Sequence, residues 1–247
     1  MAPEQIVLFD IPTKPPRTTW SLNPWKTRLV LASSTLTSNL DYKGSEFASQ
    51  TVWRYAINVC SVEPDLDGDY TIPTIILPDG TYVMDSRKIV DVINGKYPEP
   101  ALKVETKYLD WFGRNYGKLM GRLRGVYVPN VVKRLLDPYA HEYWYQTREK
   151  SNGMPLDQLE RELGGQKAWE MAAPLLQELT GLLKENEGPF FEGDEVTYVD
   201  FVWVGALLFI QKIGEDFFEE LLKAAGDAKP HLGLLEGCKQ WTDRRDY

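Results

Sequence analysis

The spacing of apolar and polar positions divides the chain into two parts. In the first part, apolar positions form short runs of strand length, separated by polar loops and turn residues. Gln5 to Phe9 predicts a buried strand, Asn23-Pro24 predicts a helix start with Asn23 as its N-cap, and Thr51 to Ile57 predicts a second strand. Residues 70–97 add a hairpin and a closing helix. This order predicts an α/β domain over residues 1–97.

The second part has no strand signals of any length. Its apolar positions recur at helical spacing, and Pro98-Glu99-Pro100 provides a linker at its start. Gly188-Pro189 and Lys229-Pro230 separate helical segments. We therefore expect an all-helical domain over residues 98–247, with helices near residues 101–125, 129–150, 155–186, 198–213, 215–225 and 231–243.

Residues 70–89 form a strand–turn–strand–helix pattern. Thr71 to Leu77 is β-branched and aliphatic, Pro78-Asp79-Gly80 supplies a tight turn, and Thr81 to Met84 is the return strand. Asp85-Ser86 then opens a helix. These two residues either cap that helix or bind a zwitterionic ligand, with the exposed amides taking the anion and the acid taking the cation.

Pro73 lies where the first strand of this hairpin begins. Proline is normally excluded from a central strand because it removes a ladder donor. A cis Ile72–Pro73 bond would explain its presence and would turn the backbone of Ile72 outward toward a bound peptide. Only about 5% of X-Pro bonds are cis, so the spacing alone does not establish one.

The charge balance limits the classes of partner. The chain has 36 acidic and 28 basic residues, a net charge of −8, which disfavours nucleic acid and anionic membranes. No apolar run approaches the roughly 20 residues needed to span a bilayer, and no signal peptide is evident, so we expect a cytoplasmic location. Cys60 and Cys238 form no CxxC pair, and with His141 and His231 as the only histidines we expect no metal site.

Polar side chains at the start of the first predicted helix are candidates for catalysis. Ser21 has a hydroxyl and Asn23 has a side-chain amide, and both groups donate hydrogen bonds. Together with a helix N-terminus, such donors stabilise a thiolate. The alternative is that both residues only cap the helix.

Taken together, these segments resemble the glutathione transferases. The string over residues 70–89 resembles the glutathione-binding half of their thioredoxin-like domain. Leu8 to Ile11, Ser21-x-Asn23 and Trp25-Lys-Thr-Arg28 are similar to the fungal-specific class A branch, which is etherase-like and of the serine type. The resemblance covers residues 5–31 and 70–97 closely and the helical part in outline.

The resemblance implies a fold and a set of site residues. The fold is an N-terminal thioredoxin-like domain followed by an all-helical domain that borders a hydrophobic substrate pocket. Ile72 and Pro73 would bind the cysteinyl backbone of glutathione, and Asp85 and Ser86 its γ-glutamyl end. Ser21 would donate to the thiol, with Asn23 as a second donor. A homodimer, glutathione as co-substrate and the absence of a metal are also implied.

The implied function is conjugation of glutathione to hydrophobic or aromatic electrophiles, with ether cleavage and peroxide reduction as related reactions. The alternative is a non-catalytic, ligandin-like carrier or regulator of aromatic small molecules on the same scaffold. Residues 32–62 depart from the family pattern and favour this alternative. Thiol-disulfide exchange through Cys60 is a third, weaker interpretation, because a lone cysteine is more often inert packing. The resemblance also makes deglutathionylation the weaker activity, because position 21 holds no cysteine.

The helical half contains two further patterns. Thr197 and Asp200 match a capping box, which we expect to nucleate a core helix. Tyr116 and Tyr127 are candidates for the rim of the hydrophobic pocket, with core packing as the alternative. Glycines recur every fourth residue, either for close helix packing or to leave space in that pocket, at Gly113, Gly117, Gly121 and Gly125.

Overall fold

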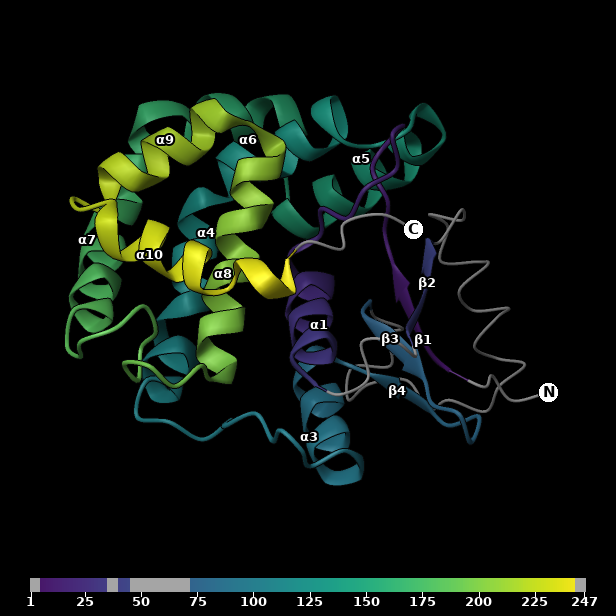
Figure 1. Cartoon of the computed structure of the whole chain (residues 1–247). Coiled ribbons are helices and arrows are strands. Elements are labelled where there is room, and N and C mark those ends of the chain that lie inside the picture. The colour runs from purple at the N-terminus through teal and green to yellow at the C-terminus, as the bar shows by residue number, and fades with distance from the viewer. Residues whose placement is uncertain (1–4, 35–39, 45–71, 243–247) are drawn as a thin grey trace. The chain divides into compact units, whose positions relative to one another are not determined.

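The computed structural model describes residues 5–34, 40–44 and 72–242 of the chain. These residues form two compact units (Figure 1). The first contains the described residues up to Leu102, together with Trp241 and Thr242, and the second extends from Lys103 to Gln240. The predicted strand at Thr51 to Ile57, like Cys60, lies outside the described residues.

The first unit is built on a four-stranded sheet within the described ranges. Its strands are β1 (Ile6–Asp10), β2 (Leu40–Gly44), β3 (Thr74–Ile76) and β4 (Tyr82–Met84), in the spatial order β2-β1-β3-β4. β1 pairs in parallel with β2 and antiparallel with β3, which pairs antiparallel with β4. The order of elements predicted an α/β domain, and this sheet has the thioredoxin-like arrangement that the resemblance implied. The strand beside β1 begins at Leu40, earlier in the chain than the strand expected from the sequence.

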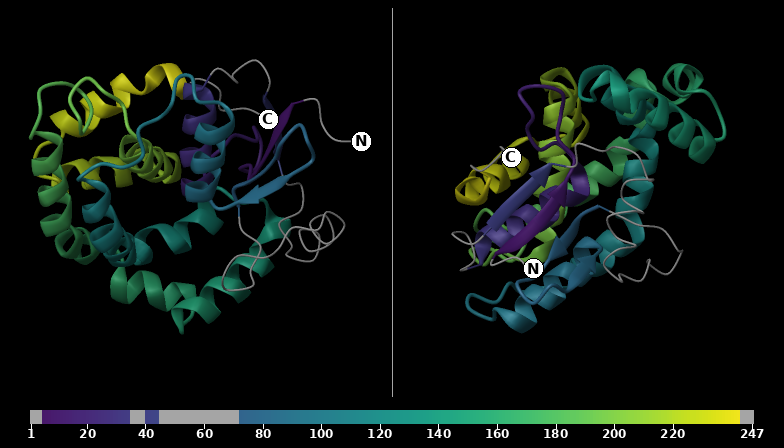
Figure 2. Two further views of the ribbon diagram at one scale, coloured as in Figure 1. Left: turned by 90° about the horizontal axis from the view of Figure 1, so that it is seen from below. Right: turned by 90° about the vertical axis from the view of Figure 1, so that its right-hand side faces the viewer.

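Two helices of this unit, α1 (Leu22–Ser33) and α3 (Ser86–Lys96), lie side by side along the sheet (Figure 2). Asn23 is not the N-cap of α1, as the sequence suggested: Ser21 occupies that position. The helix therefore starts two residues earlier, and Pro24 lies in its first turn, where the missing amide hydrogen costs nothing.

The hairpin between β3 and β4 forms as predicted. Gly80 has a φ of 85°, which a residue with a side chain rarely adopts, and its amide donates to Leu77 O at 2.8 Å. The Thr81 amide donates to Asp79 Oδ1 at 2.9 Å. The turn leads β4 directly to Asp85 and the start of α3.

The second unit is helical over its described length, as predicted, but some of the expected boundaries are wrong. The helix expected over residues 101–125 begins later and continues through Pro129, because Val126, Val128 and other buried residues pack on both sides of the proline. The helix expected over residues 155–186 is two helices that meet at Gly164. The helices are α4 (Leu109–Arg134), α5 (Pro138–Asn152), α6 (Leu156–Leu163), α7 (Gly165–Leu183), α8 (Tyr198–Ile213), α9 (Glu215–Ala224) and α10 (Lys229–Gly237), followed by the short helix η2 (Lys239–Trp241).

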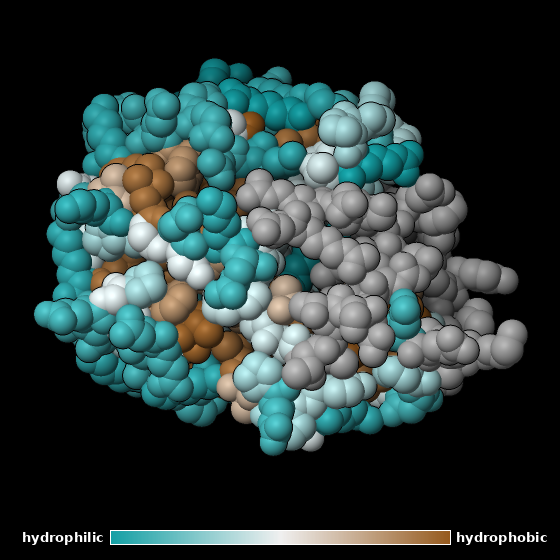
Figure 3. Space-filling view, in the orientation of Figure 1, coloured by the Kyte–Doolittle hydropathy of each residue, from teal (hydrophilic) through white to brown (hydrophobic). Residues whose placement is uncertain are grey.

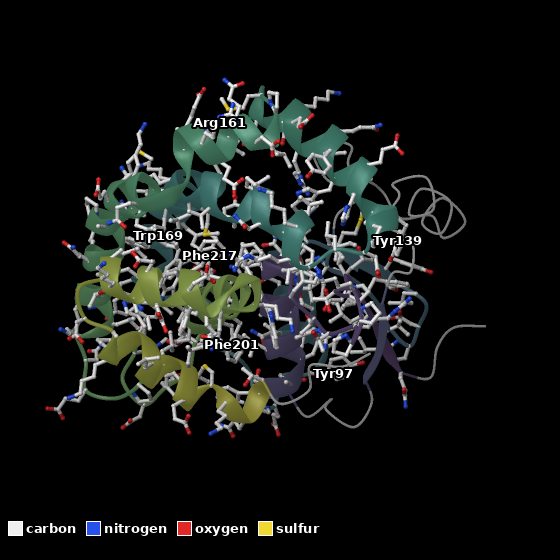
Figure 4. All side chains as sticks on the ribbon, turned by 90° about the horizontal axis from the view of Figure 1, so that it is seen from above. Tyr97, Tyr139, Arg161, Trp169, Phe201 and Phe217 are labelled. Carbon is white, nitrogen blue, oxygen red and sulfur yellow. The ribbon has the colours of Figure 1, made fainter. Side chains whose placement is uncertain are left out.

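The core of the second unit surrounds α8, whose predicted bounds are confirmed. Phe201 on this helix is fully buried in the interior, whereas Tyr139 on α5 is exposed at the periphery (Figure 4). The predicted capping box is present: Asp200 Oδ2 accepts from the Thr197 amide at 2.7 Å. Asp200 Oδ1 also accepts from the Phe191 amide at 2.9 Å, so this carboxylate joins the preceding loop to the helix.

The four glycines that recur every fourth residue lie on α4, and they do not share one structural role. A side chain at Gly125 would overlap the backbone of Leu163 and Gly164, so this glycine permits α4 to approach the end of α6. Apart from the adjoining backbone of α4 itself, a methyl group at the other three positions would meet no described atom within 4 Å, at Gly113, Gly117 and Gly121. Close packing therefore explains one of the four glycines.

In the view of Figure 3, the surface that is not drawn in grey is mostly hydrophilic, with patches of apolar residues among the hydrophilic ones. None of the helices in the described ranges has the length and hydropathy needed to cross a bilayer.

Candidate glutathione site

Ser21 lies at the N-terminus of α1, where its hydroxyl has no capping role. Its backbone is extended (φ −74°, ψ 134°) and its carbonyl accepts from the Trp25 amide at 3.1 Å, but its side chain makes no capping hydrogen bond. The first turn of α1 contains no acidic residue. The initial amides of a helix have no intrahelical acceptor and carry a partial positive charge. This end of α1 therefore favours an anion, with a half-buried hydroxyl beside it.

Asn23 is exposed in the first turn of α1. Its Oδ1 accepts a hydrogen bond from Lys26 Nζ at 2.9 Å, one helical turn further along. The oxygen of the Asn23 side-chain amide is therefore engaged in a hydrogen bond. Asn23 is not the N-cap that the sequence suggested.

Lys26 is only 9% exposed, which is unusual for a lysine. Burial lowers the pKa of its ammonium from 10.5 to about 8, while the charge of Asp85 acts in the opposite direction and raises it. The N-terminal parts of α1 and α3 therefore lie close enough for these two charges to interact. Sequence analysis missed this residue. The available signal was a lysine one turn after Asn23, between the apolar residues of the same helix.

Asp85 precedes α3 in a conformation that is rare for residues other than glycine, with φ 73° and ψ 127°. Such conformations cost about 1–3 kcal/mol and concentrate at functional sites. One carboxylate oxygen, Oδ1, accepts from the amides of Arg87 and Lys88 at 2.9 and 3.1 Å. Capping and ligand binding are compatible here, because the cap uses only one oxygen of the carboxylate.

The other candidate residues lie next to Asp85 along the chain or in the adjacent strand. Ser86 is the first residue of α3 and is 8% exposed. Ile72 and Pro73 precede β3, which pairs with β4, the strand that leads to Asp85. The Ile72–Pro73 peptide bond is cis, as the resemblance implied.

Tyr116 and Tyr127 lie on α4, in the second unit. Burial raises the pKa of both phenols, and the Tyr127 and Tyr198 phenols raise that of Tyr116 further. The structure therefore brings these three hydroxyl groups near one another. Tyr127 also packs edge-to-face on Phe209, with ring centroids 5.4 Å apart. Both roles suggested by the sequence, core packing and pocket lining, are compatible with this position.

Comparison with known proteins identifies the family that the second unit matches. Residues 109–229 match the family model described as glutathione S-transferase, C-terminal domain. The helical unit belongs to the glutathione transferase family. The first unit of this glutathione transferase-like chain carries the thioredoxin-like arrangement expected of its partner domain. No cluster of three or more histidine, cysteine or acidic side chains in the described ranges has the arrangement of a metal site.

Fungal proteins are similar to this chain over nearly all of its length. The glutathione S-transferase-like protein ustS of Aspergillus flavus is 26% identical, over 95% of this chain and 90% of its own. A glutathione S-transferase of Ceriporiopsis subvermispora, CsGST63524, solved in complex with glutathione, is 24% identical with a TM-score of 0.79, covering 98% of this chain and 100% of its own.

Glutathione transferase GSTFuA3 of Phanerochaete chrysosporium is also similar in structure. It is 23% identical with a TM-score of 0.78, covering 97% of this chain and 98% of its own. These likenesses confirm the predicted fold and the resemblance to glutathione transferases.

Proposed function

We propose that this chain is a glutathione transferase in which the Ser21 hydroxyl donates a hydrogen bond to the glutathione sulfur and holds it as a thiolate. The observation that carries the proposal is the position of Ser21 at the N-cap of α1, with a hydroxyl that does not cap the helix. The thiolate attacks a hydrophobic or aromatic electrophile: a bond forms between sulfur and carbon, and the leaving group departs with the displaced electron pair.

The energetic requirement for this role is modest. A free cysteine thiol has a pKa near 8.5, so most of it is protonated at neutral pH. One hydroxyl donor and the positive end of α1 need to lower that pKa by about one to two units, at about 1.4 kcal/mol for each unit. Ser21 is a donor to sulfur in this mechanism and forms no covalent bond.

The other end of the ligand fits the start of α3. The γ-glutamyl end of glutathione carries one carboxylate and one ammonium group. The amides at the start of α3, with Ser86, favour the carboxylate. The second oxygen of Asp85 suits the ammonium, because Oδ1 alone serves the cap. Ile72 and Pro73 would bind the cysteinyl backbone between the two helix ends.

Tyr116 and Tyr127 are proposed to line the electrophile pocket, since their buried phenols combine an aromatic surface with hydroxyl groups. The glutathione complex of CsGST63524 supports glutathione as the co-substrate. A homodimer stays a prediction from the family resemblance.

Two measurements test the proposal. Calorimetric titration should detect glutathione binding, and the chain should conjugate glutathione to a model aryl halide. Ser21→Ala should slow conjugation by about tenfold or more, the scale expected when one hydrogen-bond donor to a developing anion is lost. Ser33→Ala is the matched control, because the Ser33 hydroxyl donates to Val30 O at the opposite end of the same helix.

Each contrary outcome has a distinct meaning. If glutathione at millimolar concentration does not bind but aromatic compounds do, the chain is a carrier rather than a transferase. If glutathione binds and Ser21→Ala conjugates at the wild-type rate, Ser21 has no part in the mechanism.

A further inference from the structure

Lys26 makes a contact that fixes the orientation of the Asn23 side chain. The two residues lie three positions apart on α1, and Lys26 Nζ is 2.9 Å from Asn23 Oδ1. An ammonium group has only donors, so the atom that faces it must be the amide oxygen. The amide nitrogen, with its two hydrogens, therefore points away from the lysine.

The location of this pair matters because Asn23 lies two residues after Ser21 on the same helix end. Asn23 is exposed, whereas the lysine that holds it is almost completely buried. Burying an ammonium group costs free energy unless the protein supplies partners. Here the buried lysine donates a hydrogen bond that orients an exposed amide. This arrangement indicates a functional role for Lys26 rather than a contribution to stability.

We propose that Lys26 is a positioning residue for the thiolate: it holds Asn23 so that the amide nitrogen becomes a second hydrogen-bond donor to the glutathione sulfur, beside the Ser21 hydroxyl. This inference rests on the proposed function. Without the lysine, the amide can rotate and present its oxygen, which repels a thiolate. The positive charge of Lys26 also polarises the amide and makes its N–H groups stronger donors.

The groups around Lys26 agree with this role. The charge of Asp85, at the start of α3, favours the charged form of the ammonium, although burial opposes it. Because Asp85 Oδ1 is held by the Arg87 and Lys88 amides, this carboxylate has a fixed position. The same acid thus supports Lys26 and, in the proposed function, contacts the γ-glutamyl ammonium.

The test compares Lys26→Met, Lys26→Arg, Asn23→Ala and the double variant Lys26→Met/Asn23→Ala. Two quantities are measured: the pKa of enzyme-bound glutathione, from the ultraviolet absorbance of its thiolate, and kcat and KM for conjugation. We expect Lys26→Met to raise the pKa of the bound thiol by about one unit, equivalent to a change of about 1.4 kcal/mol or tenfold. The effect should fall on kcat, with KM for glutathione nearly unchanged, because the amide contacts only the sulfur.

The other variants, with Asn23→Asp and a control added, have their own expected results. Lys26→Arg should retain most of the activity, since its guanidinium also donates without accepting. Asn23→Ala should reproduce the loss, and the double variant should lose no more than either single variant. Asn23→Asp should also lose activity, because a carboxylate keeps the bond to Lys26 but has no donor for the sulfur. Lys96→Met, which removes an exposed lysine that pairs with Asp79, is the control and should behave as wild type.

The inference is wrong if Lys26→Met leaves the bound thiol pKa and kcat unchanged, or if Asn23→Asp keeps full activity. It is also wrong if the effects of Lys26→Met and Asn23→Ala simply add, since Lys26 would then act independently of Asn23. In each of these cases a wild-type protein that conjugates glutathione still supports the proposed function. A wild-type protein that fails to bind glutathione overturns both.

Discussion

Arg28 Nε lies 2.6 Å from Asp10 Oδ2, and both side chains are almost completely buried, at 2% and 0% exposure. The same carboxylate accepts from the Thr19 hydroxyl at 2.7 Å and, through Oδ1, from the Ile11 amide at 2.6 Å. The ion pair therefore joins the end of β1, the loop that follows it and the middle of α1. It fixes the segment that carries Ser21 to the sheet.

Removing Arg28 should destabilise the protein strongly. Arg28→Ala leaves the Asp10 carboxylate buried without its cation, and breaking a buried pair in this way costs about 3–5 kcal/mol. Urea unfolding measures the change. Arg87→Ala is the control, because the Arg87–Asp91 pair is exposed and of the i,i+4 type, worth only about 0.3–0.5 kcal/mol. Equal effects of the two substitutions would contradict the role given to Arg28.

His231 makes the stability of the helical unit depend on pH. Trp203 Nε1, which can only donate, lies 2.9 Å from His231 Nδ1, so that nitrogen must be an unprotonated acceptor. His231 Nε2 then carries the proton and donates to the Thr180 hydroxyl at 2.8 Å. Burial lowers the pKa of the imidazole from 6.5 to about 4.

The unfolded chain therefore binds more protons at this site than the folded protein between pH 6.5 and about 4. The stabilisation is fully present above pH 6.5 and is lost as pH falls, by about 2 kcal/mol between pH 7 and pH 5. His231→Gln should lack this dependence. Asp200, whose pKa burial raises to about 6, contributes with the opposite sign, so the measured quantity is the difference in unfolding free energy between wild type and variant. A difference that does not change with pH would contradict the assignment.

We expect the substitution of alanine for glycine to have opposite effects on stability at two positions of α4. Gly125→Ala forces a Cβ into the backbone of Leu163 and Gly164 and should destabilise the protein. The added methyl group of Gly121→Ala meets no described atom within 4 Å apart from the adjoining backbone of α4, and it should stabilise the protein by about 0.5–1 kcal/mol through helix propensity. Thermal unfolding of both variants checks the pair. Similar effects at the two positions would show that Gly125 does not contact α6.

One substitution at Asp85 can separate its capping of α3 from its proposed contact with glutathione. Asp85→Asn keeps a side-chain oxygen to accept from the Arg87 and Lys88 amides, so the stability should change little. The charge that we propose to contact the γ-glutamyl ammonium is lost, and the affinity for glutathione should fall by about tenfold, the size of one charge-assisted hydrogen bond. Calorimetry measures the affinity and thermal unfolding the stability. An unchanged affinity would place the ammonium elsewhere.

Much of the fold could be predicted because local signals agreed with each other. The turn at Gly80, the start of α3 at Ser86 and the bounds of α8 follow from turn residues, caps and periodicity. The helix breaks were harder. Tertiary packing carries α4 through Pro129. At the break between α6 and α7, Gly164 approaches the carbonyl of Gly125 too closely for a side chain, a contact that no local pattern reveals.

The site was only partly predictable for a similar reason. Ser21 and Asp85 occupy helix starts, which sequence signals mark. The role of Asn23 depends on its bond to Lys26, and the burial of that lysine depends on packing between elements far apart in the sequence. A lysine within an apolar helix pattern gives no indication of which group it faces.

The pKa of the thiol of bound glutathione tests the central claim most directly. Titrating the thiolate absorbance of the wild-type complex should give a pKa at least one unit below the value of about 8.5 for a free cysteine thiol. Ser21→Ala should raise it by about one unit, while Ser33→Ala should leave it unchanged. An unperturbed thiol in the wild-type complex, or one that Ser21→Ala leaves equally acidic, would contradict the account.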